Sequence, residues 1–123
     1  MVKREVIGAH YGLRDWLAQR ITAVVMGVYT LLMLVMLARM PSLDYGHWSA
    51  LWELPPVRYG TLLFLLCLYF HVWIGVRNIF MDYVKGSGLR LVLYVITIGA
   101  LVCYAAWSIQ IMWGLDATAG PKL

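Results

Sequence analysis

The sequence has little charge, and this lack excludes most classes of water-soluble protein. Only 13% of its 123 residues are charged, whereas 63% are hydrophobic, and the mean hydropathy is +0.76. A soluble domain of this size keeps a large part of its surface in water and needs far more charge to do so. The composition therefore predicts an integral membrane protein.

Cysteine is also scarce, and its placement excludes several cofactor types. Cys67 and Cys103 stand alone in separate apolar runs, without the spacing of metal ligands, and no Cys-x-x-Cys-His is present. Any haem would therefore be held non-covalently, as b type. We interpret both cysteines as small apolar packing residues rather than as a disulfide or cluster ligands.

Three charge-free runs, over residues 21–38, 59–76 and 91–115, are long enough for membrane-spanning helices, which need about 18 or more apolar residues. We predict an all-α membrane protein with three transmembrane helices at about residues 17–39, 58–81 and 89–115. Residues 1–123 then form a single membrane domain, with an interfacial outer loop at about 40–57.

The first run is long, lacks a clear small-residue cleavage site and is followed by two further spans, so we interpret it as a permanent helix. Residues 1–19 mix basic and acidic side chains, unlike an acid-poor transit peptide. A bacterial inner membrane is the simplest location. Residues 11–19 are expected to form a short surface helix that runs directly into the first span.

The basic residues predict the orientation. Seven lie before the first span or around the second connection (Lys3, Arg4, Arg14, Arg20, Arg77, Lys85, Arg90), and three lie on the other side (Arg39, Arg58, Lys122). The positive-inside rule places the larger set, with the N-terminus, in the cytoplasm and the C-terminus in the periplasm. Because this topology and anionic lipid account for the pI of about 9.3, we expect no nucleic-acid partner.

The outer loop contains helix-start signals. Ser42 or Asp44 is placed to cap a short interfacial helix whose Trp48, Leu51 and Trp52 share one face. Pro55 and Pro56 prepare entry into the second span. We interpret His47 as a solvated loop histidine rather than a metal ligand.

The second span contains a histidine, His71, within an apolar run, where an ionisable side chain needs a ligand or a partner. It belongs to one helix face of small and polar residues at steps of three or four (Gly60, Phe64, Cys67, His71, Gly75, Asn78, Asp82). Gly75, one turn below, would let a planar ring approach the backbone. His71 is thus a candidate axial ligand of haem iron; the alternative is a hydrogen bond to a neighbouring helix.

No other histidine lies within a predicted span, because His10 and His47 are in flanking segments on opposite sides. If His71 binds haem, the second axial ligand comes from another subunit, or the sixth position stays open.

Polar residues gather at the cytoplasmic end of the same span. A phenol such as Tyr83 can donate a hydrogen bond to a quinone carbonyl, and the adjacent Asp82 can orient a basic group or relay a proton. Alternatively, Tyr83 is an interfacial anchor and Asp82 pairs with Lys85 or Arg77. Arg20, before the first span, either reaches lipid headgroups or meets an acid group of a buried cofactor.

These residues resemble a known family. His71, ten further residues and then Asp82-Tyr83 stand within Phe-His-Val-Trp-Ile-Gly-Val and Met-Asp-Tyr-Val-Lys, and Arg-Asp-Trp and Gln-Arg-Ile-Thr-Ala occur near the first span. This pattern resembles the smaller hydrophobic membrane-anchor subunit of bacterial succinate dehydrogenase. The likeness covers all three spans in length and order.

The resemblance implies a four-subunit complex in which a flavoprotein with FAD oxidises succinate and an iron–sulfur protein passes on the electrons. The two anchor subunits pack into one helical bundle that binds haem b and quinone. His71 would be one axial ligand, with the other from the larger anchor subunit. Tyr83 would hydrogen-bond the quinone, supported by Asp82, and Arg20 would compensate a haem propionate.

The chain is not expected to be active alone, because it has no nucleotide-binding loop, no cluster cysteines and no soluble domain. Two other readings stay open. In the first, the chain is a small b-type cytochrome subunit of another membrane oxidoreductase. In the second, it is a haem-free anchor or assembly protein in which His71 serves only helix packing.

Overall fold

Three long helices and one short helix make up the described part of the chain. The computed structural model describes the backbone of residues 9–118 and the side chains of residues 12–114. The helices are α1 (Ala9–Ala38), α2 (Tyr45–Glu53), α3 (Pro55–Tyr83) and α4 (Ser87–Thr118), and these residues contain no strand. Stretches Gly12–Ala38, Pro55–Tyr83 and Ser87–Gly114 are long and apolar enough to cross a membrane. The predicted all-α fold with three spans is confirmed.

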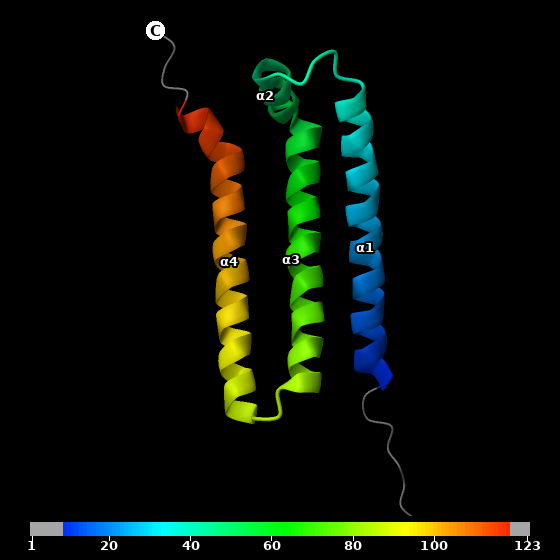
Figure 1. Cartoon of the computed structure of the whole chain (residues 1–123), viewed down its shortest axis with the longest axis vertical. Coiled ribbons are helices and arrows are strands. Elements are labelled where there is room, and N and C mark those ends of the chain that lie inside the picture. Colours follow the sequence, from blue (N-terminus) through cyan, green and yellow to red (C-terminus); the bar gives the residue numbers. More distant parts are fainter. Residues whose placement is uncertain (1–8, 119–123) are drawn as a thin grey trace, which may run out of the picture.

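The long helices stand side by side with α3 in the middle (Figure 1). Helix α3 contacts α1, α4 and α2, whereas α1 and α4 make no contact with each other within the described residues. Helices α1 and α4 run in one direction and α3 in the other, so α1 begins where α3 ends. We call this the Tyr83 end, and the opposite end, which carries α2, the α2 end.

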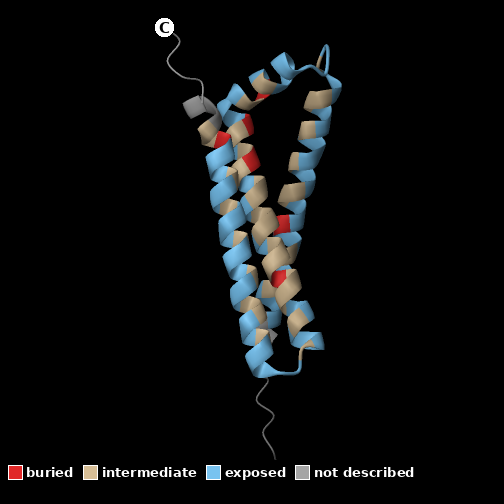
Figure 2. Cartoon of the chain, turned by 60° about the vertical axis from the view of Figure 1, so that its left-hand side comes forward, coloured by how far each residue is buried: buried red, intermediate tan, exposed pale blue. Residues whose placement is uncertain are grey.

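Burial is sparse and concentrates along α3 (Figure 2). The buried side chains are Thr22, Leu51, Val57, Thr61, Ile74 and Met112. By contrast, α1 and α4 expose large apolar side chains on most of their surface, such as Leu31 at 65% and Val95 at 63%. Helices that are apolar nearly all round need lipid or other helices against them. The exposure therefore fits a membrane-integral chain.

Capping explains where α2 begins and ends. Asp44, in extended conformation, accepts a hydrogen bond from the His47 backbone N–H at 2.8 Å, as an N-cap residue does. Trp48 and Trp52 then pack edge to face, with ring centroids 5.4 Å apart, and Leu51 is buried. Pro55 and Pro56 occupy the first turn of α3, where a missing N–H costs nothing. Of the two predicted caps, Ser42 and Asp44, the structure shows Asp44, and the predicted proline start of the second span is confirmed.

Helix α1 is one continuous helix from residue 9 onward, so the segment expected on the surface does run directly into the span. At the other end of α3, residues 84–86 form a short connection to α4. Aromatic pairs hold α4 against α3: Trp73 with Tyr94, centroids 5.7 Å apart, and Tyr59 with Trp113, 6.1 Å apart. The hydroxyls of Tyr69 and Ser108 add a hydrogen bond of 2.5 Å.

Candidate functional site

The predicted polar face of α3 packs mainly against α1. Near the α2 end, Tyr29 of α1 packs on Phe64 with ring centroids 4.7 Å apart, and its hydroxyl bonds that of Thr61. Gly60 admits the same tyrosine, since a Cβ there would lie 3.6 Å from the Tyr29 ring. The face continues through His71 and Gly75, which also meet α1. Small residues let the two backbones approach closely.

His71 is half-buried in the middle of α3, against α1. Its Nδ1 lies 2.9 Å from the hydroxyl oxygen of Thr22, which is only 6% exposed. Gln19, almost one turn earlier on α1, donates from Nε2 to the His71 backbone carbonyl at 3.2 Å. Both the ring and the backbone of His71 are thereby fixed to α1.

The other ring nitrogen of His71, Nε2, has no hydrogen-bond partner among the residues that the structure describes. These residues also contain no group of three histidine, cysteine or acidic side chains arranged to hold a metal ion. A haem iron needs no such group, because the macrocycle supplies four nitrogens and the protein only the axial ligands. An imidazole with Nδ1 engaged and Nε2 without a protein partner fits an axial ligand.

Gly75 faces Gln19, not open space: a Cβ at this position would lie 3.7 Å from Gln19 Nε2, an ordinary contact distance. The expected role of Gly75 in haem packing stays a prediction. Arg20 is exposed, and its guanidinium carbon lies 5.5 Å from the Trp16 ring centroid, within cation–π range. Its expected contact with a haem propionate likewise stays a prediction.

An ion pair joins α1 to α3 between His71 and the Tyr83 end. Arg77 donates from a terminal guanidinium nitrogen to the carboxylate of Asp15, and about a third of each side chain is exposed. Arg77 Nε and, one turn after Asp15 on α1, Gln19 Oε1 are buried without a hydrogen-bond partner among the described residues. The sequence had suggested Arg77 as a partner of Asp82, but the structure gives Arg77 to Asp15, which lies 62 residues earlier.

At the end of α3 the residues of the polar face are no longer covered by α1 or α4. Asn78 and Asp82 are exposed, and Tyr83, the last helical residue, is 82% exposed. Among the described residues, neither Asp82 nor Tyr83 has a side-chain hydrogen bond or ion pair. Tyr83 lies about 18 Å along the helix axis from His71. The two candidate sites are thus on one helix but in different environments.

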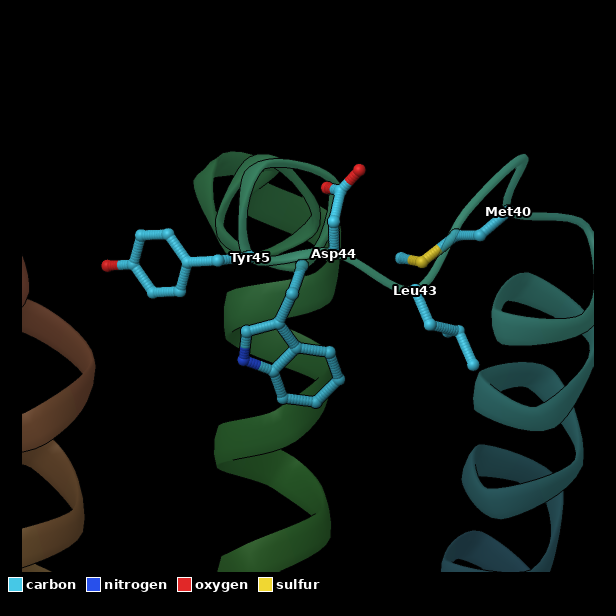
Figure 3. Close-up of a pocket in the computed structure, with 5 residues that line it drawn as sticks. Met40, Leu43, Asp44 and Tyr45 are labelled. Carbon is cyan, nitrogen blue, oxygen red and sulfur yellow. The ribbon is translucent and has the colours of Figure 1, made fainter.

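The α2 end contains a separate polar cluster. Asp44 accepts hydrogen bonds from the His47 backbone and the Ser42 hydroxyl and contacts His47 Nδ1 at 2.8 Å. These hydrogen bonds hold the pKa of Asp44 well below its usual value. The His47 backbone N–H has the largest effect and the Ser42 hydroxyl the next largest. An open hollow of about 260 Å³ lies beside it, lined by Met40, Leu43, Asp44, Tyr45 and Trp48 (Figure 3). His47 is exposed, as expected, but it lies in the first turn of α2 rather than in a loop.

Thr22, Gln19 and Asp15 are neighbours of the candidate site that sequence reasoning did not assign. All three lie on the side of α1 that meets α3, at spacings of three or four residues. The signal available in the sequence was the spacing itself, since polar residues at these steps share one helix face.

Fold and site define a class of protein: a three-span helical membrane protein with a single histidine held at the contact between two of its spans. The model of the succinate dehydrogenase/fumarate reductase transmembrane subunit family matches residues 2–107, and the chain belongs to this family. It is 37% identical over 102 residues to the succinate dehydrogenase hydrophobic membrane anchor subunit of Coxiella burnetii (strain RSA 493 / Nine Mile phase I). That match covers 83% of this chain and 89% of the relative.

Proposed function

We propose that this chain is the smaller anchor subunit of a succinate:quinone oxidoreductase, that it shares haem b with a second anchor subunit, and that it forms part of the quinone-reduction site. The observation that carries the proposal is His71: a mid-span imidazole held at Nδ1 by Thr22, with Nε2 free of protein partners among the described residues. Family membership supports the anchor role, since the chain is the membrane part of an enzyme complex.

His71 would hold the haem iron through Nε2, and the larger anchor subunit would supply the second protein ligand. When bound, haem supplies a one-electron redox centre within the membrane. The chain's own part is to present the imidazole at a fixed depth and rotation. Gln19 and Thr22 do this from α1, through the backbone and ring of His71 respectively. Arg20 is proposed to compensate a propionate, and Gly75 to pack near the ring.

Quinone is proposed to bind at the Tyr83 end. The Tyr83 hydroxyl donates a hydrogen bond to a quinone carbonyl, and Asp82 supports the local polar network and proton delivery. Reduction takes two electrons, which a docked iron–sulfur subunit delivers, and two protons, giving the quinol. Both side chains are accessible to a ligand, because neither has a partner within the described chain. Their position at the end of α3 where basic residues gather supports this role.

The remaining partners follow from the same proposal. A flavoprotein subunit with FAD and an iron–sulfur subunit carry out succinate oxidation, and this chain with the larger anchor holds them at the membrane. The excess of basic residues around the Tyr83 end supports a bacterial inner membrane location with that end in the cytoplasm and the C-terminus in the periplasm.

Replacement of His71 by Ala tests the proposal. The purified complex should show a b-type reduced-minus-oxidised spectrum, and His71→Ala should abolish or shift it because an axial ligand is lost. His47→Ala is the matched control: this exposed histidine lies at the α2 end and should leave the spectrum unchanged. A spectrum that survives His71→Ala unaltered would remove His71 as ligand, and a complex without haem would favour an anchor of another kind.

A further inference from the structure

The hydroxyl oxygen of Thr22 lies within hydrogen-bond distance of three polar atoms. Its oxygen is 2.7 Å from the Ala18 carbonyl oxygen, 3.2 Å from that of Gln19, and 2.9 Å from His71 Nδ1. The side chain is 6% exposed, so the helices leave little of it open to solvent. A hydroxyl has one proton and two lone pairs, so it can donate only one full hydrogen bond.

The Thr22 hydroxyl is best placed to donate its hydrogen bond to the Ala18 carbonyl oxygen. Three other helical threonines make the same bond to the carbonyl four residues earlier: Thr30 at 2.8 Å, Thr61 at 2.7 Å and Thr97 at 2.8 Å. This is the usual bond of a threonine inside a helix, and 2.7 Å is the preferred O–H···O distance. The lone pairs of Thr22 then face His71, where the 2.9 Å distance suits an N–H donor.

We propose that Thr22 is a positioning residue that holds His71 in the tautomer protonated at Nδ1, which leaves the lone pair of Nε2 available to iron. The inference rests on the proposed haem ligation and adds to it the residue that selects the ligand atom. An imidazole whose proton sits on Nε2 cannot coordinate through that atom, and an acceptor at Nδ1 also makes the ligand more basic. Gln19 completes the arrangement, since its bond to the His71 carbonyl fixes the depth of α3 against α1.

The test compares three variants of the whole purified complex. Thr22→Val removes the hydroxyl while keeping the shape, Thr22→Ser restores a hydroxyl, and Thr30→Val removes an equivalent helical hydroxyl that has no histidine beside it. Loss of such a partner typically weakens metal binding about 10- to 100-fold. We expect Thr22→Val to transfer haem to apomyoglobin more readily by about that factor. It should also raise the haem midpoint potential, because a less basic imidazole stabilises ferric iron less.

Thr22→Ser and Thr30→Val should both keep the haem affinity, potential and low-spin electron paramagnetic resonance signal of the unmodified complex. If Thr22→Val also leaves all three unchanged while His71→Ala removes the haem signal, the positioning role is wrong and the ligand role stands. If His71→Ala leaves the haem signal intact, both fail. Should Thr22→Val not assemble, Thr22→Ser against Thr22→Ala decides: rescue by serine alone supports the role, and equal behaviour overturns it.

Discussion

Two tyrosines at opposite ends of the molecule have nearly the same exposure, but only Tyr83 is predicted to bind quinone. Tyr83 is 82% exposed at the end of α3, and Tyr45 is 81% exposed at the start of α2. Neither hydroxyl has a hydrogen bond among the residues that the structure describes. Exposure alone therefore does not distinguish a quinone ligand from an interfacial anchor, and the distinction depends on the end of the molecule that each occupies.

Replacing Tyr83 by Phe should impair quinone reduction at least about tenfold, since a hydrogen bond of about 1.4 kcal/mol in the transition state corresponds to that factor. Succinate oxidation by an artificial dye should be spared, because the dye takes electrons before the quinone site. Tyr45→Phe, with matched exposure, should change neither rate. Steady-state assays with quinone and dye measure both, and an equal loss of the two activities in Tyr83→Phe would sink the assigned role.

At the residue scale the sequence located His71 because an ionisable group within an apolar run is costly and stands out. It located Asp82 and Tyr83 because polar residues gather at the end of the same span. The partners of His71 could not be found in the same way. Thr22 is 49 residues away and Gln19 is 52, and both contacts depend on how α1 is rotated against α3. The pairing of Asp15 with Arg77 depends on the same rotation.

At the scale of the element, α2 shows how one side chain starts a short helix between two spans. Asp44 accepts hydrogen bonds from the His47 backbone and from Ser42, and α2 is only nine residues long. A helix this short has marginal stability of its own and depends on its cap and on Leu51, which is buried. The sequence was sufficient here because the cap, the helix and the following prolines are local signals.

The lowered pKa of Asp44 gives α2 a defined response to acid. A carboxyl whose pKa falls on folding contributes stability above its unfolded pKa and loses it as the pH falls through the folded value. The contribution of the Asp44 carboxylate to amide protection of α2, corrected for intrinsic exchange, should therefore be present from pH 7 to about 4 and be lost only below that range. Asp44→Ala should lower this protection at neutral pH and Asp44→Asn should largely retain it. Hydrogen exchange read by mass spectrometry checks both, and equal loss in the two variants would contradict the capping role.

At the scale of the whole molecule, the three spans form a row rather than a closed bundle. Helix α3 contacts both neighbours, and within the described residues α1 and α4 do not touch. The number and type of spans were predictable because the charge-free runs are long and each is bounded by charged residues. The order of the helices in the row was not predictable, because the apolar surface of each span can pack equally well against lipid or against another helix.

Because so few side chains are buried within this row of helices, we expect the chain to be purified together with other protein chains. A tagged chain extracted in mild detergent should co-purify with a flavoprotein, an iron–sulfur protein and a second membrane anchor, since the proposed second haem ligand and the quinone site require them. Flavin fluorescence and mass spectrometry of the purified material measure this. Recovery of the chain alone, with no flavin, from membranes that retain succinate dehydrogenase activity would contradict the assignment.

The contacts between α1 and α3 also have a consequence for biogenesis. Asp15, Gln19 and Thr22 are synthesised 49 to 62 residues before the groups on α3 that they bind. We expect the first span to enter the bilayer before these polar side chains have their α3 partners, so that their hydrogen bonds form only when α3 follows. Helix α4, whose contacts are with α3 alone among the long helices, then joins a pair already assembled. We therefore expect insertion of this chain to be ordered, with the second span binding the first before the third packs against it.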